Sequence, residues 1–174
     1  MFTPSLRALA VAAALTTAGT AQAATVNLVA DAGWERFAFG DVGTPVTSRS
    51  FSFSLIGSAI FSVVDAFVGG DSFAVFSNGS FLGNTSTPAA PGASTGMNFD
   101  AAFADTTGHS SGSWLLGPGN YLITLSVLTR SPGTGDHIGA VRLDTAPVPV
   151  PAGGALLLSG LGLAALMRKR RKDA

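Results

Sequence analysis

Apolar and polar residues alternate along the central part of the chain with a period of two. The stretch 48–55 (SRSFSFSL) places two phenylalanines and a leucine on one side and serines on the other. A period of two gives a strand with one buried and one solvated face. The stretches 59–68 (AIFSVVDAFV) and 71–83 (DSFAVFSNGSFLG) continue the pattern. All three are predicted to be β-strand regions.

Turn residues separate the predicted strands. Asn78-Gly79 lies between two alternating runs and predicts a two-residue β-hairpin. A Gly-Pro-Gly turn at 117–119 precedes residues 121–128 (YLITLSVL), which we expect to form a strand buried on most of both sides. Residues 137–144 (HIGAVRLD) supply a closing strand. Short strands between Gly, Asn and Pro indicate an all-β fold, an antiparallel β-sandwich of jelly-roll type.

Residues 84–97 (NTSTPAAPGASTGM) interrupt the alternation and are predicted to be a long surface loop. We find no convincing amphipathic helix outside the two termini. Trp114 is in phase with Leu116, so we expect Trp114 to pack in the core.

The N-terminus contains the three parts of a secretory signal peptide. Arg7 gives a charged start, ALAVAAAL forms an apolar run too short to span a bilayer, and Ala21 and Ala23 form an A-x-A site. We therefore expect export by the Sec machinery and removal of residues 1–23 by signal peptidase, which would cut before Ala24.

The C-terminus has an apolar run followed by a basic tail. Residues 152–167 are uncharged, and as a helix they would reach only about 24 Å, at about 1.5 Å per residue. A hydrocarbon core is about 30 Å thick, so this predicted transmembrane helix is a marginal one. The tail, residues 168–174, is expected to lie at the cytoplasmic surface. Its basic residues are Arg168, Lys169, Arg170, Arg171 and Lys172.

A Pro-rich stretch, residues 147–152, precedes that helix. Its motif consists of Val148, Pro149, Val150, Pro151 and Ala152. Motif, apolar run and basic tail together resemble the PEP-CTERM class of bacterial sorting signal in its VPLPA-type variant, with Val150 where Leu is usual and without the Glu of the P-E-P form. The resemblance implies recognition by an exosortase-type membrane transpeptidase, cleavage near the motif, and transfer to the envelope or secreted matrix of a Gram-negative bacterium.

Residues 24–146, between the two ends, have a length that suits one domain. The chain has no Cys, which excludes disulfides and Cys-based metal or redox chemistry. Four arginines, no lysine and nine acidic residues give this region a formal net charge of −5. Nucleic-acid binders need a basic surface, so this balance argues against a nucleic-acid partner. It suits solubility outside the cell, or a cation such as Ca²⁺.

The core of this domain resembles a β-sandwich domain of secreted microbial proteins. The matching stretches are 61–86 (FSVVDAFVGGDSFAVFSNGSFLGNTS), 103–125 (FADTTGHSSGSWLLGPGNYLITL) and 135–144 (GDHIGAVRLD). Domains of that kind typically carry V-x-D-A-F and G-D-x-F-x-V-x-x-N-G. The resemblance supports the fold and brings no activity with it.

Aspartates at the predicted strand ends are the candidate metal ligands. Asp65 ends one strand and Asp71 opens the next, so their carboxylates are expected near one loop, with Asp105 and Asp144 contributing from neighbouring loops. Ca²⁺ takes about six to eight oxygen ligands of this kind. The alternative, which we favour, is that these aspartates cap turns through backbone N–H groups.

The other candidates are two histidines and a tryptophan. No G-x-S-x-G elbow accompanies His109 and its neighbouring serines, so we expect His109 to be a solvated loop side chain and His137 to lie at a turn. Trp34 is the exposed candidate for stacking on a sugar. Glu35 is the single Glu of the domain, which matches poorly with the carboxylate pair of glycosidases.

From the sequence we expect an exported protein that passes through an inner-membrane intermediate and reaches the outer surface or extracellular matrix. Its domain would have a structural or adhesive role in extracellular polysaccharide or biofilm, without enzymatic activity. Two alternatives stay open, a calcium-dependent carbohydrate-binding module and a secreted polysaccharide hydrolase.

Overall fold

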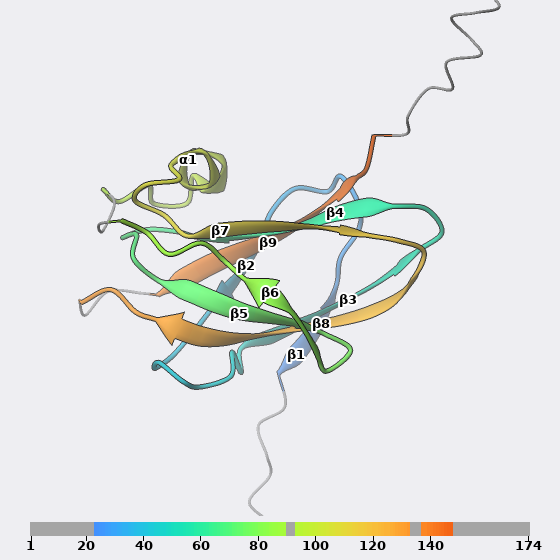
Figure 1. Ribbon diagram of the computed structural model, residues 1–174, viewed down its shortest axis with the longest axis horizontal. Helices are drawn as coiled ribbons and strands as arrows, with labels where there is room; N and C mark the ends of the chain where they lie inside the picture. The colour runs from blue at the N-terminus through green and yellow to red at the C-terminus, as the bar shows by residue number, and fades with distance from the viewer. Residues whose placement is uncertain (1–22, 90–92, 133–136, 148–174) are drawn as a thin grey trace, which may run out of the picture.

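The computed structural model describes residues 23–89, 93–132 and 137–147, which form a two-layer β-sandwich (Figure 1). Sheet A has the order β1 (Ala24–Asn27), β3 (Arg49–Leu55), β8 (Gly119–Thr129), β5 (Ser72–Ser77) and β6 (Ser80–Asn84). Sheet B has the order β2 (Glu35–Ala38), β9 (Ile138–Thr145), β4 (Ala59–Asp65) and β7 (Ser111–Leu116).

Residues 1–22 of the predicted signal peptide, the predicted transmembrane helix and the basic tail lie outside the described residues, as do all residues of the sorting motif from Val148 onward. Within the described part of the chain, no helix is long and apolar enough to cross a membrane.

Strands β2 to β9 pair in a nested order. β5 pairs with β6, β4 with β7, β3 with β8 and β2 with β9, each pair is antiparallel, and successive pairs alternate between the two sheets. β8 also pairs with β5 and β9 with β4, which joins the pairs into sheets. This part of the chain is therefore one long hairpin wound into two layers. β1 departs from the predicted antiparallel arrangement, because it joins the edge of sheet A as a parallel neighbour of β3.

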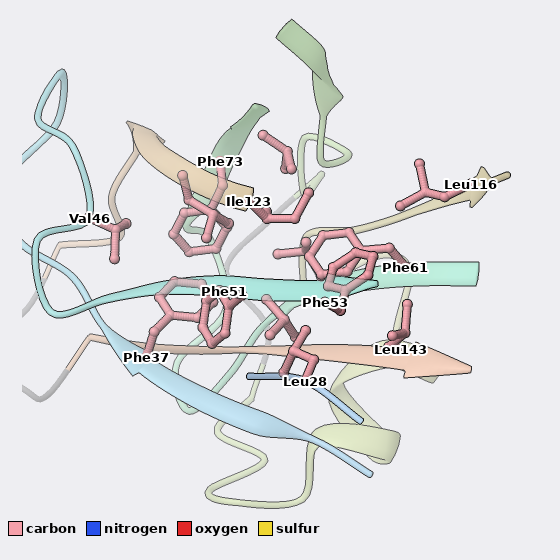
Figure 2. Close-up of a cluster of buried hydrophobic side chains, with 14 of the residues drawn as sticks. Leu28, Phe37, Val46, Phe51, Phe53, Phe61, Phe73, Leu116, Ile123 and Leu143 are labelled. Atoms are coloured by element: carbon pink, nitrogen blue, oxygen red, sulfur yellow. The ribbon is translucent and has the colours of Figure 1, made fainter. Parts of the chain in front are cut away.

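The core lies between the two sheets and is rich in phenylalanine (Figure 2). Phe51 and Phe53 of β3, Phe61 of β4 and Phe73 of β5 are each at most 3 % exposed. Phe53 of sheet A stacks on Phe61 of sheet B with ring centroids 5.9 Å apart. Burying such a side chain contributes about 1.5–3 kcal/mol, so the predicted period-two residues hold the two layers together.

The Asn78-Gly79 hairpin is present, and β8 differs from its prediction. Asn78 (φ +50°) and Gly79 (φ +78°) have the left-handed conformations that a type I′ turn requires. In β8 the even-numbered residues Leu122 and Leu128 are 43 % and 39 % exposed. The expectation that this strand is buried on both sides is wrong, because a two-layer sandwich buries only one face of each sheet.

Trp114 is partly buried and packs against the core, where it closes one side of the sandwich. Its ring stacks on Phe61 at 6.3 Å and lies directly over Gly83 of β6. A Cβ atom at Gly83 would come within 2.6 Å of the indole nitrogen, so this approach needs a glycine. The indole therefore seals the gap between β6 and β7.

One segment contradicts the expectation of no helix between the termini. Helix α1 (Phe99–Ala104) begins after Asn98, whose side chain accepts a hydrogen bond from the backbone N–H of Ala101 at 3.0 Å. The helix lies on the outer face of sheet B, where Ala102 packs against Val64 and Ala140 (Figure 1). Six residues are too few to show a helical period in the sequence.

Candidate functional site

The predicted aspartate pair forms at the end of the sandwich where β4 leads into β5. Asp65 is the last residue of β4 and Asp71 directly precedes β5, and they are 0 % and 1 % exposed. Oδ2 of Asp65 accepts hydrogen bonds from the backbone N–H groups of Gly70 and Asp71, each at 3.0 Å. Gly70, with φ +123°, allows the loop to fold back over Asp65. Asp65 thereby caps the turn between the two strands.

Asp71 links that loop to the segments on either side of the β8–β9 connection. Its Oδ1 accepts a hydrogen bond from the backbone N–H of Ser131 at 2.5 Å, and its Oδ2 lies 3.3 Å from Nδ1 of His137. The His137 side chain is 8 % exposed, and its ring lies 5.5 Å from that of Phe39. Asp65, Asp71 and His137 thus form one buried cluster, called here the Asp65 cluster.

Two polar atoms of the Asp65 cluster have no hydrogen-bond partner in the described part of the chain. They are Oδ1 of Asp65 and Nε2 of His137. Burial raises the pKa of Asp65 to about 8, and the like charge of Asp71 adds to the effect. A pKa of about 8 favours the protonated form of Asp65 at neutral pH, because its carboxyl is buried and Oδ1 has no donor among the described residues.

A second Asp–His pair lies beside the first, since the N–H of Asp65 donates to the carbonyl oxygen of Ser110 at 2.9 Å. Nδ1 of His109 lies 3.0 Å from Oδ2 of Asp105. Nε2 of His109 lies 3.4 Å from the carbonyl oxygen of Phe67 and 3.5 Å from Oγ1 of Thr95. His109 is 0 % exposed, so the expectation of a solvated side chain is wrong. Its burial is possible because both ring nitrogens have partners inside the protein.

Asp105 differs from Asp65 in its hydrogen bonds. Oδ1 of Asp105 accepts hydrogen bonds from the hydroxyl of Thr107 at 2.8 Å and from the backbone N–H of Gly108 at 3.1 Å. The hydrogen bond from the Thr107 side chain, followed by those from Gly108 and His109, lowers the pKa of Asp105 to about 2. These bonds hold the turn after α1 in place, with Asp105 ionised.

The serine beside His109 is engaged elsewhere. The Ser110 hydroxyl is buried and donates a hydrogen bond to Oγ1 of Thr85, which itself accepts the N–H of Phe73 at 2.9 Å. A nucleophilic serine needs a hydrogen bond to its base. Among the described hydrogen bonds, the Ser110 hydroxyl donates to Thr85 and not to His109. Ser110 therefore helps to hold β5 in place through Thr85.

Asp144 lies away from the other three aspartates. It pairs in register with Ile60, whereas Asp65 at the far end of β4 pairs with Gly139. Five residues of strand at about 3.3 Å each separate the two ends by about 17 Å. Oδ2 of Asp144 accepts a hydrogen bond from Nε of Arg142 at 2.7 Å. The structure brings Asp65 and Asp71 together but not Asp144, and over residues 23–89, 93–132 and 137–147 no group of three acidic or His residues is arranged to hold a metal ion.

Trp34 is half-buried, which contradicts its expected exposure. Its Nε1 donates to Oδ1 of Asp100 at 2.8 Å, and the ring packs against Phe103 at 5.4 Å. The guanidinium of Arg142 lies 4.4 Å from the ring centroid, in a cation–π contact. Trp34 therefore fastens α1 to sheet B, and one face of its ring is covered by Arg142.

The contact between Asp71 and His137 was missed in the sequence. The two residues are 66 positions apart, and no spacing rule connects them. The one feature of the sequence that could have indicated the contact is that each residue directly precedes a strand, Asp71 before β5 and His137 before β9.

A scan against protein-family models finds no match for this sequence, and a search of curated proteins finds none either. Among the solved structures that match is the pre-peptidase C-terminal domain of a collagenase from Bacillus anthracis, with a TM-score of 0.36 and 12 % sequence identity. The match covers 71 % of this chain and 95 % of that one. The two-layer sandwich is established by the pairing of its strands.

Proposed function

We propose that the chain is an exported bacterial surface or matrix protein whose sandwich domain has a structural or adhesive role in extracellular polysaccharide. The observation that carries the proposal is the order of parts at the C-terminus, where VPVPA is followed by a short apolar run and five consecutive basic residues. An exosortase-type transpeptidase would recognise these parts and cut near the motif. The apolar run, with its marginal length, would serve as a temporary membrane anchor.

The strand pairing supports the finer fold prediction, in which β2 to β9 form a jelly roll. A jelly roll has eight strands in two sheets with Greek-key connections, and the nested pairs β2–β9, β3–β8, β4–β7 and β5–β6 fit that plan. The position of the motif supports the sorting step. β9 ends at Thr145 and Pro147 is exposed, so the motif follows the last strand almost directly.

The hydrogen bonds of the Asp and His side chains favour a structural role over the calcium-module and hydrolase alternatives. Asp65, Asp71 and His137 connect the β4–β5 loop to the start of β9, and Asp105 with His109 connects the turn after α1 to the same loop. Each of these contacts fastens one loop to another. Of the residues on which the two alternatives depended, Asp65, Asp71, Asp105 and His109 are thus occupied in holding this end of the sandwich together.

The test is the intact mass of the protein made in a host that carries an exosortase. We expect a chain that begins at Ala24 and ends between Val148 and Ala152, with or without an added group. A mass difference between the host and a strain lacking the exosortase would assign the cut to that enzyme. A membrane-bound chain that still ends at Ala174 in both strains would overturn the sorting step and leave a tethered sandwich domain.

A further inference from the structure

A pocket of about 320 Å³ opens beside β2, the edge strand of sheet B. It is lined by Arg36, Phe37 and Ala38 of β2, by Ser48 and Arg49 at the entry to β3, and by Ile138 of β9. The Ser48 hydroxyl donates a hydrogen bond to the carbonyl oxygen of Ala38, which ties the two walls together. The volume suits a ligand of about one sugar ring, at the small end of ligand pockets.

The pocket concentrates positive charge on an acidic domain. Arg36 and Arg49 are two of the four arginines in residues 24–146, a region whose formal net charge is −5. Nη1 of Arg49 contacts Oε2 of Glu35 at 3.1 Å, and both side chains are partly exposed. Arg36 is exposed and makes no side-chain hydrogen bond or ion pair with another described residue. Two arginines and one glutamate leave the pocket with a local charge of +1.

That charge and the geometry of guanidinium groups select the ligand chemistry. A guanidinium presents a planar fork of N–H donors that matches a carboxylate. Arg49 already holds a carboxylate, that of Glu35. A local charge of +1 balances a monoanion better than a phosphate, which carries about two negative charges. Ile138 and Ala38 add apolar wall, so the body that carries the carboxylate has an apolar face to meet it.

We propose that this Arg36–Arg49 pocket binds the carboxylate of a small organic unit, of the size of a uronic acid sugar. The proposal deepens the adhesive role proposed above by giving it a ligand class. The export and sorting steps do not depend on ligand binding, and a separate measurement, the mass of the processed chain, tests them. Failure of one is therefore distinguishable from failure of the other.

The test uses the full chain in detergent micelles and ligand-observed NMR, which detects weak binding. Glucuronic acid and glucose share a ring and differ in the carboxylate, so glucuronic acid is expected to bind and glucose is not. N-acetyl-dialanine, with a free peptide carboxylate, reports whether the same pocket accepts a carboxylate from a peptide. Binding of either carboxylate supports the proposal, and the tighter one identifies the source. Equal binding of glucose would overturn it.

Three variants locate the binding. Arg36→Gln is expected to weaken it about tenfold, the loss of one hydrogen bond to a charged group. Arg130→Gln makes the same change outside the pocket lining, at a residue paired with Asp41, and is expected to leave the affinity unchanged. Glu35→Gln removes the competing carboxylate and is expected to strengthen binding. The melting temperature of each variant shows that it folds.

The Glu35→Gln result tests whether Glu35 competes with the ligand for Arg49. The comparison of Arg36→Gln with Arg130→Gln separates the proposal from general electrostatics, because each variant removes one positive charge. Equal weakening by Arg36→Gln and Arg130→Gln, or weaker binding after Glu35→Gln, would overturn it. A gain in affinity from neutralising a carboxylate is an outcome that damage to the fold would not produce.

Discussion

Asp65 and Asp105 lie at the same end of the sandwich, each in a cluster with a histidine, yet their pKa values move in opposite directions. The pKa of Asp65 rises to about 8, chiefly because the carboxyl is buried. That of Asp105 falls to about 2, chiefly because the Thr107 hydroxyl donates to it. Oδ1 of Asp65 has no partner among the described residues, whereas both oxygens of Asp105 accept hydrogen bonds. The number of hydrogen-bond donors and the exposure to solvent, and not the residue type, determine the direction in which each aspartate pKa moves.

The two histidines repeat the contrast. Both ring nitrogens of His109 have partners, while Nε2 of His137 has none in the described part of the chain. His109 therefore belongs to a completed set of hydrogen bonds that joins three segments. His137 belongs to an incomplete one, with a single contact to Asp71 at 3.3 Å. The incomplete cluster is the place where pH should change the stability of this domain.

The largest expected effect is a pH dependence of stability that comes from Asp65. In the unfolded chain its pKa returns to the ordinary value of 3.8, and in the folded chain it is about 8. Between these values the folded state binds one more proton than the unfolded state. The free energy of unfolding should therefore fall as pH rises from about 4 to 8, by about 1.4 kcal/mol per pH unit from this group. Chemical denaturation across that range measures the slope.

Asp65→Asn is the matched control for that slope, because an amide has the shape of the protonated carboxyl and does not titrate here. The variant should match the original protein near pH 4 and exceed its stability near pH 8. Parallel stability curves for the two proteins would show that Asp65 is not protonated in the folded state.

The next effect separates the two histidines at a single pH. His109→Ala removes a fully buried ring and leaves two partners unpaired, so we expect a loss of about 3 kcal/mol in the free energy of unfolding. His137→Ala also removes an unpaired buried nitrogen, so its cost should be about half as large. Urea unfolding at pH 7 measures both. A larger loss from His137→Ala would reverse the contrast between complete and incomplete clusters.

The smallest effect concerns Asp105 in acid. Its folded pKa lies below 3.8, so the stability it contributes is present above that pH and is lost as pH falls towards 2. Asp105→Asn should flatten part of this acid loss, and the effect is small because the carboxylate is partly exposed and screened. Asp31, whose pKa is lowered by hydrogen bonds from Thr145, contributes to the same range. An unchanged acid limb in Asp105→Asn would mean that Asp31 and other groups account for it.

Much of the fold is written locally in the sequence. Phe51 and Phe53 predict the inner face of β3, and Asn78-Gly79 predicts the hairpin between β5 and β6. Both predictions succeed because strand period and turn conformation depend on neighbouring residues. Leu122 and Leu128 led to the wrong prediction that β8 is buried on both sides, because the sequence does not distinguish an apolar residue on an outer face from one in a core. α1 was missed because its one clear signal is the Asn98 cap.

The candidate site was less predictable, since its contacts span the chain. Asp65 and Asp71 share one loop, and the sequence placed them together. The burial of His109 depends on Phe67, which lies 42 residues away, and the environment of Asp71 depends on His137, which lies 66 residues away. Whether a polar side chain is solvated or buried is decided by such distant partners, and a single sequence does not show them.

The nested pairing of β2 to β9 sets an order in time as well as in space. Ser77 and Ser80 meet across a two-residue turn, whereas Glu35 must find Val141. The entropy of closing a loop grows with its length, so folding is expected to start at the hairpin and to proceed slowly outward. In a chain exported N-terminus first, as proposed above, β2 would stay unpaired until β9 had emerged. The Arg36–Arg49 pocket is lined by β2, by the entry to β3 and by Ile138 of β9, so a ligand that fits it would bind only molecules in which β2 has paired with β9.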